Sequence, residues 1–208
     1  IGVSVATLKN DASVETVFTN TNSITQSGGS GTLTYQGRGD DSSINDAIVE
    51  KDSLKTSTTL KDKLVNETIN GIYVGSSSLA TYKTLAMNVA ASGSTALQGT
   101  VQVITHAGST RSDMGAANLS AAHTLKVHTA DYLNNTNVQV AATASVRNAV
   151  GVLVGLNNSK RTVSTASNGA NLKAPTLKVR TEAKEGLSEL LFQGAGSFTG
   201  AAGSVVAG

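Results

Sequence analysis

The chain has 208 residues, of which 39% are apolar and only 14% charged; its net charge is +2 and it contains no cysteine or tryptophan. The missing cysteines exclude disulfides and thiolate metal sites, and the sparse basic and aromatic residues argue against nucleic-acid binding. Enzyme pockets are usually shaped by large side chains, and aromatic residues make up only 3% of this chain, so the composition disfavours an enzyme.

The first segment, residues 1–24, matches the later part of a unit that recurs downstream. Its GVSV (2–5) corresponds to GVLV (151–154), and its TNSI (21–24) corresponds roughly to AANL (116–119). Because internal similarity at a fixed period is typical of repeat architectures, we interpret this segment as the tail of one repeat. The opening IGVSVATLKN begins in mid-pattern, as a mature protein or an excised fragment would.

Residues 25–70 interrupt the repeat. Gly2 and Gly99, taken as equivalents, are 97 residues apart instead of 52, so about 45 residues are extra. The window 37–67 also holds 12 of the chain's 30 Lys, Arg, Asp and Glu residues. Insertions in repeat proteins lie on one face, which is often the binding face. We therefore predict two parts: a repeat region (1–24 and 71–208) and a charged insertion (25–70).

The insertion also has a different hydrophobic pattern. Between Ser43 and Ile69, two sets of apolar residues recur at helical spacing: Ile44, Ala47, Ile48 and then Leu60, Leu64, Val65. Ser43 and Ser53 are suitable helix N-caps. The pattern predicts one or two short helices, so the insertion is expected to be partly helical; a partly mobile excursion is the alternative.

The tripeptide Arg38-Gly39-Asp40 is the motif that many integrins recognise, and it lies inside this insertion. A glycine between a guanidinium and a carboxylate gives the chain the freedom to present both groups. Loops outside a repeat are exposed, so Arg38, Gly39 and Asp40 are the candidate binding residues. The alternative interpretation is that three common loop residues occur in this order by chance.

The remaining chain, residues 71–208, contains three related segments. The segment 124–155 matches 176–208 at an offset of 52, with Leu125 and Val127 opposite Leu177 and Val179, and the run 151–154 opposite 203–206. The segment 71–109 matches 124–162 at an offset of 52–53. Here Ile72 and Val74 fall on Leu125 and Val127, while Gly99 and Val101 fall on Gly151 and Val152.

Short alternating apolar runs recur about every 12 residues within a repeat, at 125–127, 138–140, 150–154 and 163. Alternation over so few residues indicates strands, and the intervening Asn and Gly residues at 134–135, 157–159 and 168–169 suit tight corners. Four strands per repeat predict about two circuits of a parallel β-helix (solenoid) in each repeat. An all-β sandwich is the alternative, because the same strand spacing suits it.

The runs GAGSFTGAAGSVVAG (194–208) and VAATASVRNAVGVLVGLNNSKRTV (140–163) resemble the repeat region of large filamentous adhesins of Gram-negative bacteria, the leukotoxin-like and haemagglutinin-like exoproteins. The resemblance covers the repeat region and leaves out the insertion. It implies a parallel β-helix shaft, secretion, and a role in attachment. It carries no catalytic residue onto this chain.

Residues suited to catalysis or metal binding are scattered. His106, His123 and His128, with Asp131 nearby, match no compact ligand spacing, and we interpret them as surface histidines, with His128 pointing away from the core. The order of Asp40, Asp41 and Asp46 lacks the alternation of a calcium loop. The other acids, Asp113, Glu182, Glu185 and Glu189, form no cluster along the sequence. We expect no metal and no cofactor.

Three functions are compatible with these patterns. The first is a non-enzymatic extracellular adhesin or exoprotein segment on the bacterial cell surface, which binds a host or bacterial receptor through the insertion. The second is a structural subunit that self-associates into filaments by strand addition. The third is a β-helical carbohydrate-active enzyme. Membrane insertion is not expected, because the longest apolar stretch, 149–156, is far below the ~20 residues that a spanning helix needs.

Overall fold

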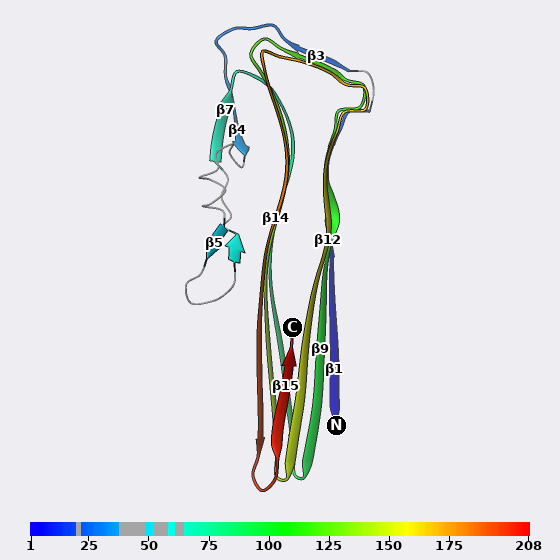
Figure 1. The fold of residues 1–208 in the computed structure, drawn as a ribbon, viewed down its shortest axis with the longest axis vertical. Coiled ribbons are helices and arrows are strands. Elements are labelled where there is room, and N and C mark those ends of the chain that lie inside the picture. Colours follow the sequence, from blue (N-terminus) through cyan, green and yellow to red (C-terminus); the bar gives the residue numbers. More distant parts are fainter. Residues whose placement is uncertain (20–21, 38–48, 52–57, 61–64) are drawn as a thin grey trace.

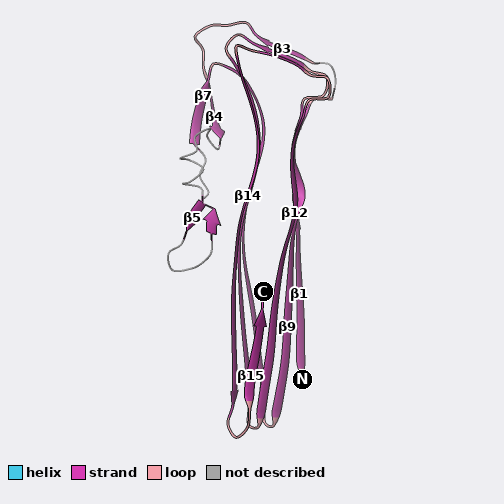
Figure 2. Cartoon of the chain, in the orientation of Figure 1, coloured by secondary structure: helices cyan, strands magenta, loops and turns pink. Residues whose placement is uncertain are grey.

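The computed structural model describes residues 1–19, 22–37, 49–51, 58–60 and 65–208. This part of the chain is all-β (Figure 2). It contains no helix, and hence no membrane-spanning helix. Long parallel sheets dominate it, in an arrangement compatible with a β-helix and unlike the antiparallel sandwich that the sequence left open.

Three parallel sheets are built from strands of successive repeats. The β11 sheet contains β8 (Gly71–Ser92), β11 (Thr124–Ser145) and β14 (Thr176–Ser197). The β9 sheet contains β1 (Gly2–Asp11), β2 (Val14–Val17), β9 (Thr95–Asp113), β12 (Asn148–Ala166) and β15 (Ala202–Ala207). The short cap sheet contains β3 (Ser23–Gln26), β10 (Asn118–Ala121) and β13 (Asn171–Lys173).

The chain visits the three sheets in a fixed order, and each repeat is one circuit. The two long sheets run side by side, as Figure 1 shows. Their cap end is joined through the cap sheet, and their turn end is closed by the short turns 93–94, 146–147 and 198–201. The N-terminus lies on the edge strand β1, and the C-terminus follows β15 on the opposite edge of the same sheet (Figure 1).

The predicted register of the repeats is confirmed in the β11 sheet. Leu125 pairs with both Ile72 and Leu177, and the two neighbours of Val127 are Val74 and Val179. Gly2 aligns with Gly151 as predicted, since both pair with Gln98, but the predicted equivalence of Gly2 and Gly99 is wrong by one residue. Identical alternation in each copy keeps the same residues facing inward, which fixes this register.

Other register predictions in the β9 sheet are also wrong by one or two residues. Gly99 pairs with Val152 instead of Gly151, and Val101 pairs with Val154 instead of Val152, because the offset there is 53. Gly203 pairs with Val150 instead of Gly151. The cause of this last shift is the turn 198–201, which is longer than the turn 146–147 at the same corner.

The prediction of two circuits per repeat is also wrong. The asparagines at 134–135 and 157–159 were expected at corners, but they lie inside the long strands β11 and β12. Asn135 is fully buried there. Only the pair at 168–169 forms a corner, where Gly169 adopts a φ of 88° that other residues avoid. Two predicted strands therefore merge into one, twice in each repeat.

The described part of the insertion is built from antiparallel strands and shows no helix, in contrast to the helical prediction. Strand β4 (Leu33–Gly37) pairs with β7 (Val65–Ile69), and β5 (Val49–Lys51) pairs with β6 (Thr58–Leu60). Leu60 and Val65, expected on one helix, belong to two different strands. The other predicted helical residues, Ile44, Ala47, Ile48 and Leu64, and both caps lie outside the described residues.

The interior changes in character along the sheets. Near the cap end it is apolar, with a core formed by Ile72, Val74, Met114, Ala117, Leu119, Ala121, Leu125 and Val127. Towards the turn end the inward side chains are mostly polar or small. There Thr143 Oγ1 donates a hydrogen bond to Gln98 Oε1 across the two sheets at 2.6 Å, and Asn88 Nδ2 donates to Thr100 Oγ1 at 2.9 Å.

Candidate functional site

The candidate binding residues Arg38, Gly39 and Asp40 lie outside the described residues. The same holds for Asp41 and Asp46. The described chain reaches them from Gly37, the last residue of β4, which pairs with Val65. What the structure does show is the base of the insertion and the sheet face on which that base lies.

Aromatic stacking attaches the base of the insertion to the β11 sheet. The rings of Tyr35 in β4 and Tyr73 in β8 stack with their centroids 3.9 Å apart. Gly75 makes this possible, because a Cβ at that position would lie 2.3 Å from the hydroxyl of Tyr73. Tyr73 therefore uses the free space over Gly75 and presents its ring to the insertion. Tyr35 also donates a hydrogen bond through its hydroxyl to Glu67 Oε2 at 2.9 Å.

A buried ion pair reinforces this contact. Lys126 points outward from β11, yet its side chain is only 2% exposed because Glu67 of β7 covers it and accepts a hydrogen bond from its Nζ. The same Nζ lies 5.6 Å from the centroid of the Tyr35 ring, within cation–π range. Burial raises the pKa of the Tyr35 hydroxyl to about 12, although Lys126 acts in the opposite direction.

A second charged cluster lies further along the same outer face, centred on Glu182 of β14. Its carboxylate interacts with His128 Nε2 at 2.9 Å, accepts the Tyr132 hydroxyl at 2.5 Å and pairs with Arg180 at 2.7 Å. Burial alone would raise the pKa of Glu182. The hydrogen bonds from His128 and Tyr132 and the charge of Arg180 outweigh burial and lower this pKa to about 2.

The insertion also contacts the two strands that carry this second cluster. Strand β6 lies beside β14 and β11, and Figure 1 shows the insertion alongside β14. His128 and Tyr132 are 2% and 0% exposed although they point away from the interior. The outward orientation predicted for His128 is thus confirmed, but its interpretation as a surface histidine is wrong. His123 is exposed, as expected.

Two predicted residues instead lie in the interior between the long sheets. Asp131 faces away from His128 and forms an ion pair with Arg161, so the two cannot share a metal. His106 is fully buried, stacks on Tyr82 with ring centroids 4.9 Å apart, and has no hydrogen-bond partner among the described side chains. Burial lowers the pKa of His106, and the nearby charge of Arg161 lowers it further while Glu185 opposes them. His106 is therefore also not a surface histidine.

The remaining acids occupy separate places. Asp113 pairs with Arg111, Glu185 accepts a hydrogen bond from Ser159, and Glu189 accepts one from Asn137. Among the described residues, no group of three or more His, Asp or Glu could hold a metal ion. Asp113, Glu185 and Glu189 thus each bind a neighbouring side chain and form no common site.

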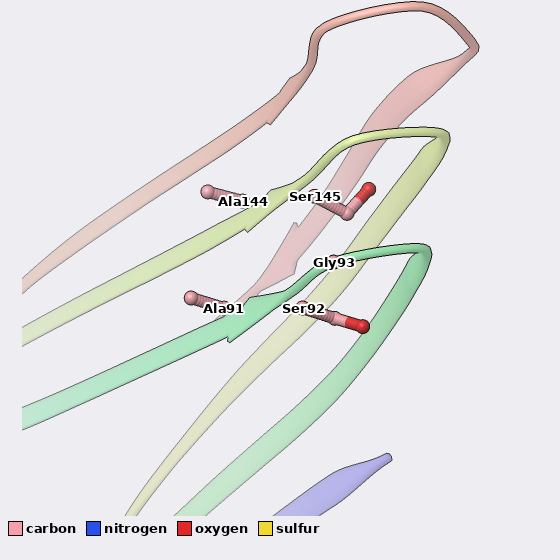
Figure 3. A pocket seen from close by; sticks show the side chains of 5 residues that line it. All are labelled: Ala91, Ser92, Gly93, Ala144 and Ser145. Atoms are coloured by element: carbon pink, nitrogen blue, oxygen red, sulfur yellow. The ribbon is translucent and has the colours of Figure 1, made fainter.

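A shallow hollow lies at the turn end, lined by Ala91, Ser92, Gly93, Ala144 and Ser145 (Figure 3). In Figure 3 the alanine side chains point to one side of the neighbouring strands and the serines to the other. Its lining carries no charged or aromatic group. It therefore offers neither a nucleophile–base pair nor an anchor for a charged ligand.

Sequence reasoning missed Tyr35, Tyr73, Lys126, Tyr132 and Arg180. A usable signal was present, because Lys126, His128 and Tyr132 alternate with the inward Leu125, Val127 and Leu133 along one strand. Polar side chains at most outward positions of this stretch, beside a charged insertion, indicate a covered face.

No protein-family model, no curated protein and no solved structure matches this chain. The interpretation of the site therefore rests on its own geometry.

Replacing Glu182 with glutamine is expected to remove a pH dependence of stability. The folded-state pKa of about 2 lies below the ordinary 4.5, so the stabilisation is present above pH 4.5 and is lost as the pH falls towards 2. At neutral pH it is on the order of 3 kcal/mol. Urea unfolding at neutral pH and at acidic pH should show a smaller difference for the variant than for the wild type. Equal pH slopes in both proteins would contradict the assignment.

Proposed function

We propose that this chain is a non-enzymatic segment of an extracellular bacterial surface protein that mediates attachment through the insertion. The long parallel sheets serve as a β-solenoid shaft, and the insertion is the part that meets the partner. The partner is a receptor on a host or bacterial surface. The resemblance to filamentous adhesins supports secretion and the attachment role.

The observation that carries this proposal is the position of the insertion in the circuit. The corner between the cap sheet and the β11 sheet is crossed by residues 122–123 in one circuit and by 174–175 in the next. In the first circuit the same corner is crossed by residues 27–70. In the other two circuits, two residues are enough to cross this corner. We therefore expect that the fold does not need the additional residues.

The insertion base is also held in one place. The Tyr35–Tyr73 stack and the Lys126–Glu67 pair fix β4 and β7 on the outer face of the β11 sheet. A binding loop that is positioned by a rigid scaffold loses less conformational freedom when it binds a partner. This arrangement favours recognition by the loop that β4 and β7 support, which includes Arg38, Gly39 and Asp40.

The test replaces residues 27–70 with the dipeptide Ala-His, which crosses the equivalent corner at 122–123. We expect the shortened chain to keep its strand content by circular dichroism and to lose at least about tenfold in binding to cultured epithelial cells, measured by flow cytometry; a tenfold loss corresponds to about 1.4 kcal/mol. The fold should persist because two other circuits use this corner. Cell binding equal to that of the wild type would exclude the insertion as the binding element.

A matched variant, Asp40→Glu, separates the tripeptide from the rest of the insertion. It keeps the charge and lengthens the side chain by one methylene. Loss of cell binding in this variant, together with loss after removal of divalent cations, would assign the partner to the integrins. Unchanged binding by Asp40→Glu beside lost binding by the shortened chain would place recognition elsewhere in the insertion.

A further inference from the structure

The outer face of the β11 sheet is apolar towards the turn end. Its outward side chains form rows across the three strands: Leu85–Val138–Leu190, Met87–Val140–Phe192, Val89–Ala142–Gly194 and Ala91–Ala144–Gly196. Met87, Val89 and Phe192 are 69%, 73% and 55% exposed. This part of the sheet thus presents large hydrophobic side chains to the solvent, unlike the covered polar face near the insertion.

The outer face of the β9 sheet has the same character. Its rows are Leu97–Val150–Gly203, Val3–Gly99–Val152–Val205, Val5–Val101–Val154–Ala207 and Thr7–Val103–Leu156. Val3, Val5 and Val205 are 75%, 65% and 58% exposed. Both long sheets therefore show an apolar outer face at the turn end, and we call these the two apolar faces.

These apolar side chains could not be placed between the two sheets, because the interior there is already filled. A Cβ at Gly155 would lie 1.9 Å from Glu189 Oε1, and one at Gly151 would lie 1.6 Å from Gln193 Nε2. The polar side chains of the β11 sheet therefore extend to the backbone of the opposite sheet. The hydrophobic groups at this end have no place inside and are left outside.

Each apolar face alone is about half the size of a standard interface, so a copy buries that area only through two contacts, one with a neighbour on each face. Every second residue of a strand points outward. With a strand spacing of ~4.8 Å and a rise of ~3.3 Å per residue, each outward residue therefore covers about 32 Å² of the sheet. Each face then measures roughly 400 Å², against the ~800 Å² per partner of a standard interface. The rows of both faces carry no Lys, Arg, Asp or Glu. A partner recognised by charge is therefore not indicated.

A flat face of regular rows is best matched by another sheet. Side chains of two stacked sheets interdigitate when their rows have the same spacing, at a sheet separation of ~10 Å. The faces also contain openings for such side chains, because Gly194, Gly196 and Gly203 have no neighbouring atom within 4 Å of a Cβ position. Large residues such as Phe192 and Met87 lie in the next row.

Lipid is a poorer match than protein for these faces. Among the described strands, β14 and β8 each pair only with β11, so each has one backbone edge without a strand partner. Unpaired backbone groups are costly in a hydrocarbon environment that offers no hydrogen bonds. In water, packing between molecules covers the faces and leaves these edges solvated.

We propose that copies of this chain associate laterally, sheet against sheet, through the two apolar faces at the turn end. Each copy uses both faces, so the product is a layered stack and not a closed dimer. The described base of the insertion lies on the β11 sheet, against Tyr73 and Lys126, outside the rows that form its apolar face. The inference is independent of the proposed function, since the shortened chain without residues 27–70 keeps both faces.

The test places a lysine on each face. Met87→Lys lies on the β11 sheet and Val152→Lys on the β9 sheet, and their matched controls are Ser77→Lys and Thr162→Lys, exposed outward positions on β8 and β12. Analytical ultracentrifugation across a concentration series should show association of the wild type and of both controls. Each lysine variant is expected to raise the apparent dissociation constant at least about tenfold, because a buried unpaired charge is unfavourable. All variants should keep the wild-type circular dichroism spectrum.

The outcomes separate the alternatives. If like faces pack together, each single variant keeps one working face and forms dimers. If unlike faces pack together, every contact includes the altered face and each variant is a monomer. Both results support the proposal. A wild type that stays monomeric at every concentration overturns it. So does association that persists in the lysine variants and is blocked by Leu177→Lys at the open edge, which would show end-to-end strand addition. Flotation of wild-type monomers with phosphatidylcholine vesicles would also overturn it.

Discussion

Replacing Asp131 with asparagine is expected to lower the free energy of unfolding by about 3–5 kcal/mol. Asp131 and Arg161 form a bidentate pair inside the molecule, with N–O distances of 2.8 and 2.9 Å, and both side chains are only 3% exposed. The variant keeps the shape of the side chain but leaves the guanidinium charge buried without its counter-ion. Arg161 also donates to Ser78 Oγ at 3.0 Å, which does not neutralise that charge.

Chemical denaturation of the wild type and the variant measures this effect. The matched control is Asp11→Asn, which breaks the pair between Lys9 and Asp11, whose side chains are 70% and 59% exposed. Surface pairs contribute ~0–1 kcal/mol, so this control should change stability little. A double variant, Asp131→Leu with Arg161→Met, should recover most of the loss, because it removes both charges. Equal stability of Asp131→Asn and the wild type would show that the pair does not stabilise the fold.

Replacing Gly108 with alanine is the second change with a large expected effect, a loss of about 3 kcal/mol or more. Gly108 lies within β9 and has a φ of +130°, a conformation that residues with a side chain rarely adopt. A Cβ there would also lie 1.8 Å from the carbonyl oxygen of Ala12, a backbone atom between β1 and β2. The clash can be relieved only by moving a strand.

Thermal and urea unfolding of Gly108→Ala should therefore show a lower melting temperature and a lower midpoint. Gly194→Ala is the matched control, because a Cβ at Gly194 meets no atom within 4 Å and its φ is not positive. That control should be neutral or slightly stabilising, since alanine reduces the freedom of the unfolded chain. Similar losses for both variants would mean that the backbone conformation at Gly108 is not the cause.

The sequence alone predicted the all-β class and the register of the β11 sheet. These succeed because strand alternation repeats in each copy, as in Leu125 and Leu177. Corner positions were mispredicted because asparagine is common both at tight turns and in the interior of this molecule. Composition could not distinguish Asn135, buried in a strand, from Asn168, which precedes a glycine at a corner.

The candidate site was predicted only in part. The orientation of His128 follows from its place next to Val127, but its burial depends on what covers the outer face. Helical spacing of Leu60 and Val65 was misleading, because their antiparallel partners are too distant in sequence for a periodicity argument to reveal. The ion pair between Lys126 and Glu67 joins positions 59 residues apart and has no local sequence signature.

The circuit also determines the order of events during folding. Partners in the β11 sheet and along β9, β12 and β15 are 52 or 53 residues apart in the chain, and partners of β1 and β2 in β9 are 96 apart, so the first ladder forms only after a large loop has closed. Each later circuit adds to a strand edge that is already in place and ordered. We therefore expect slow nucleation followed by faster templated growth, in which a finished circuit guides the next one.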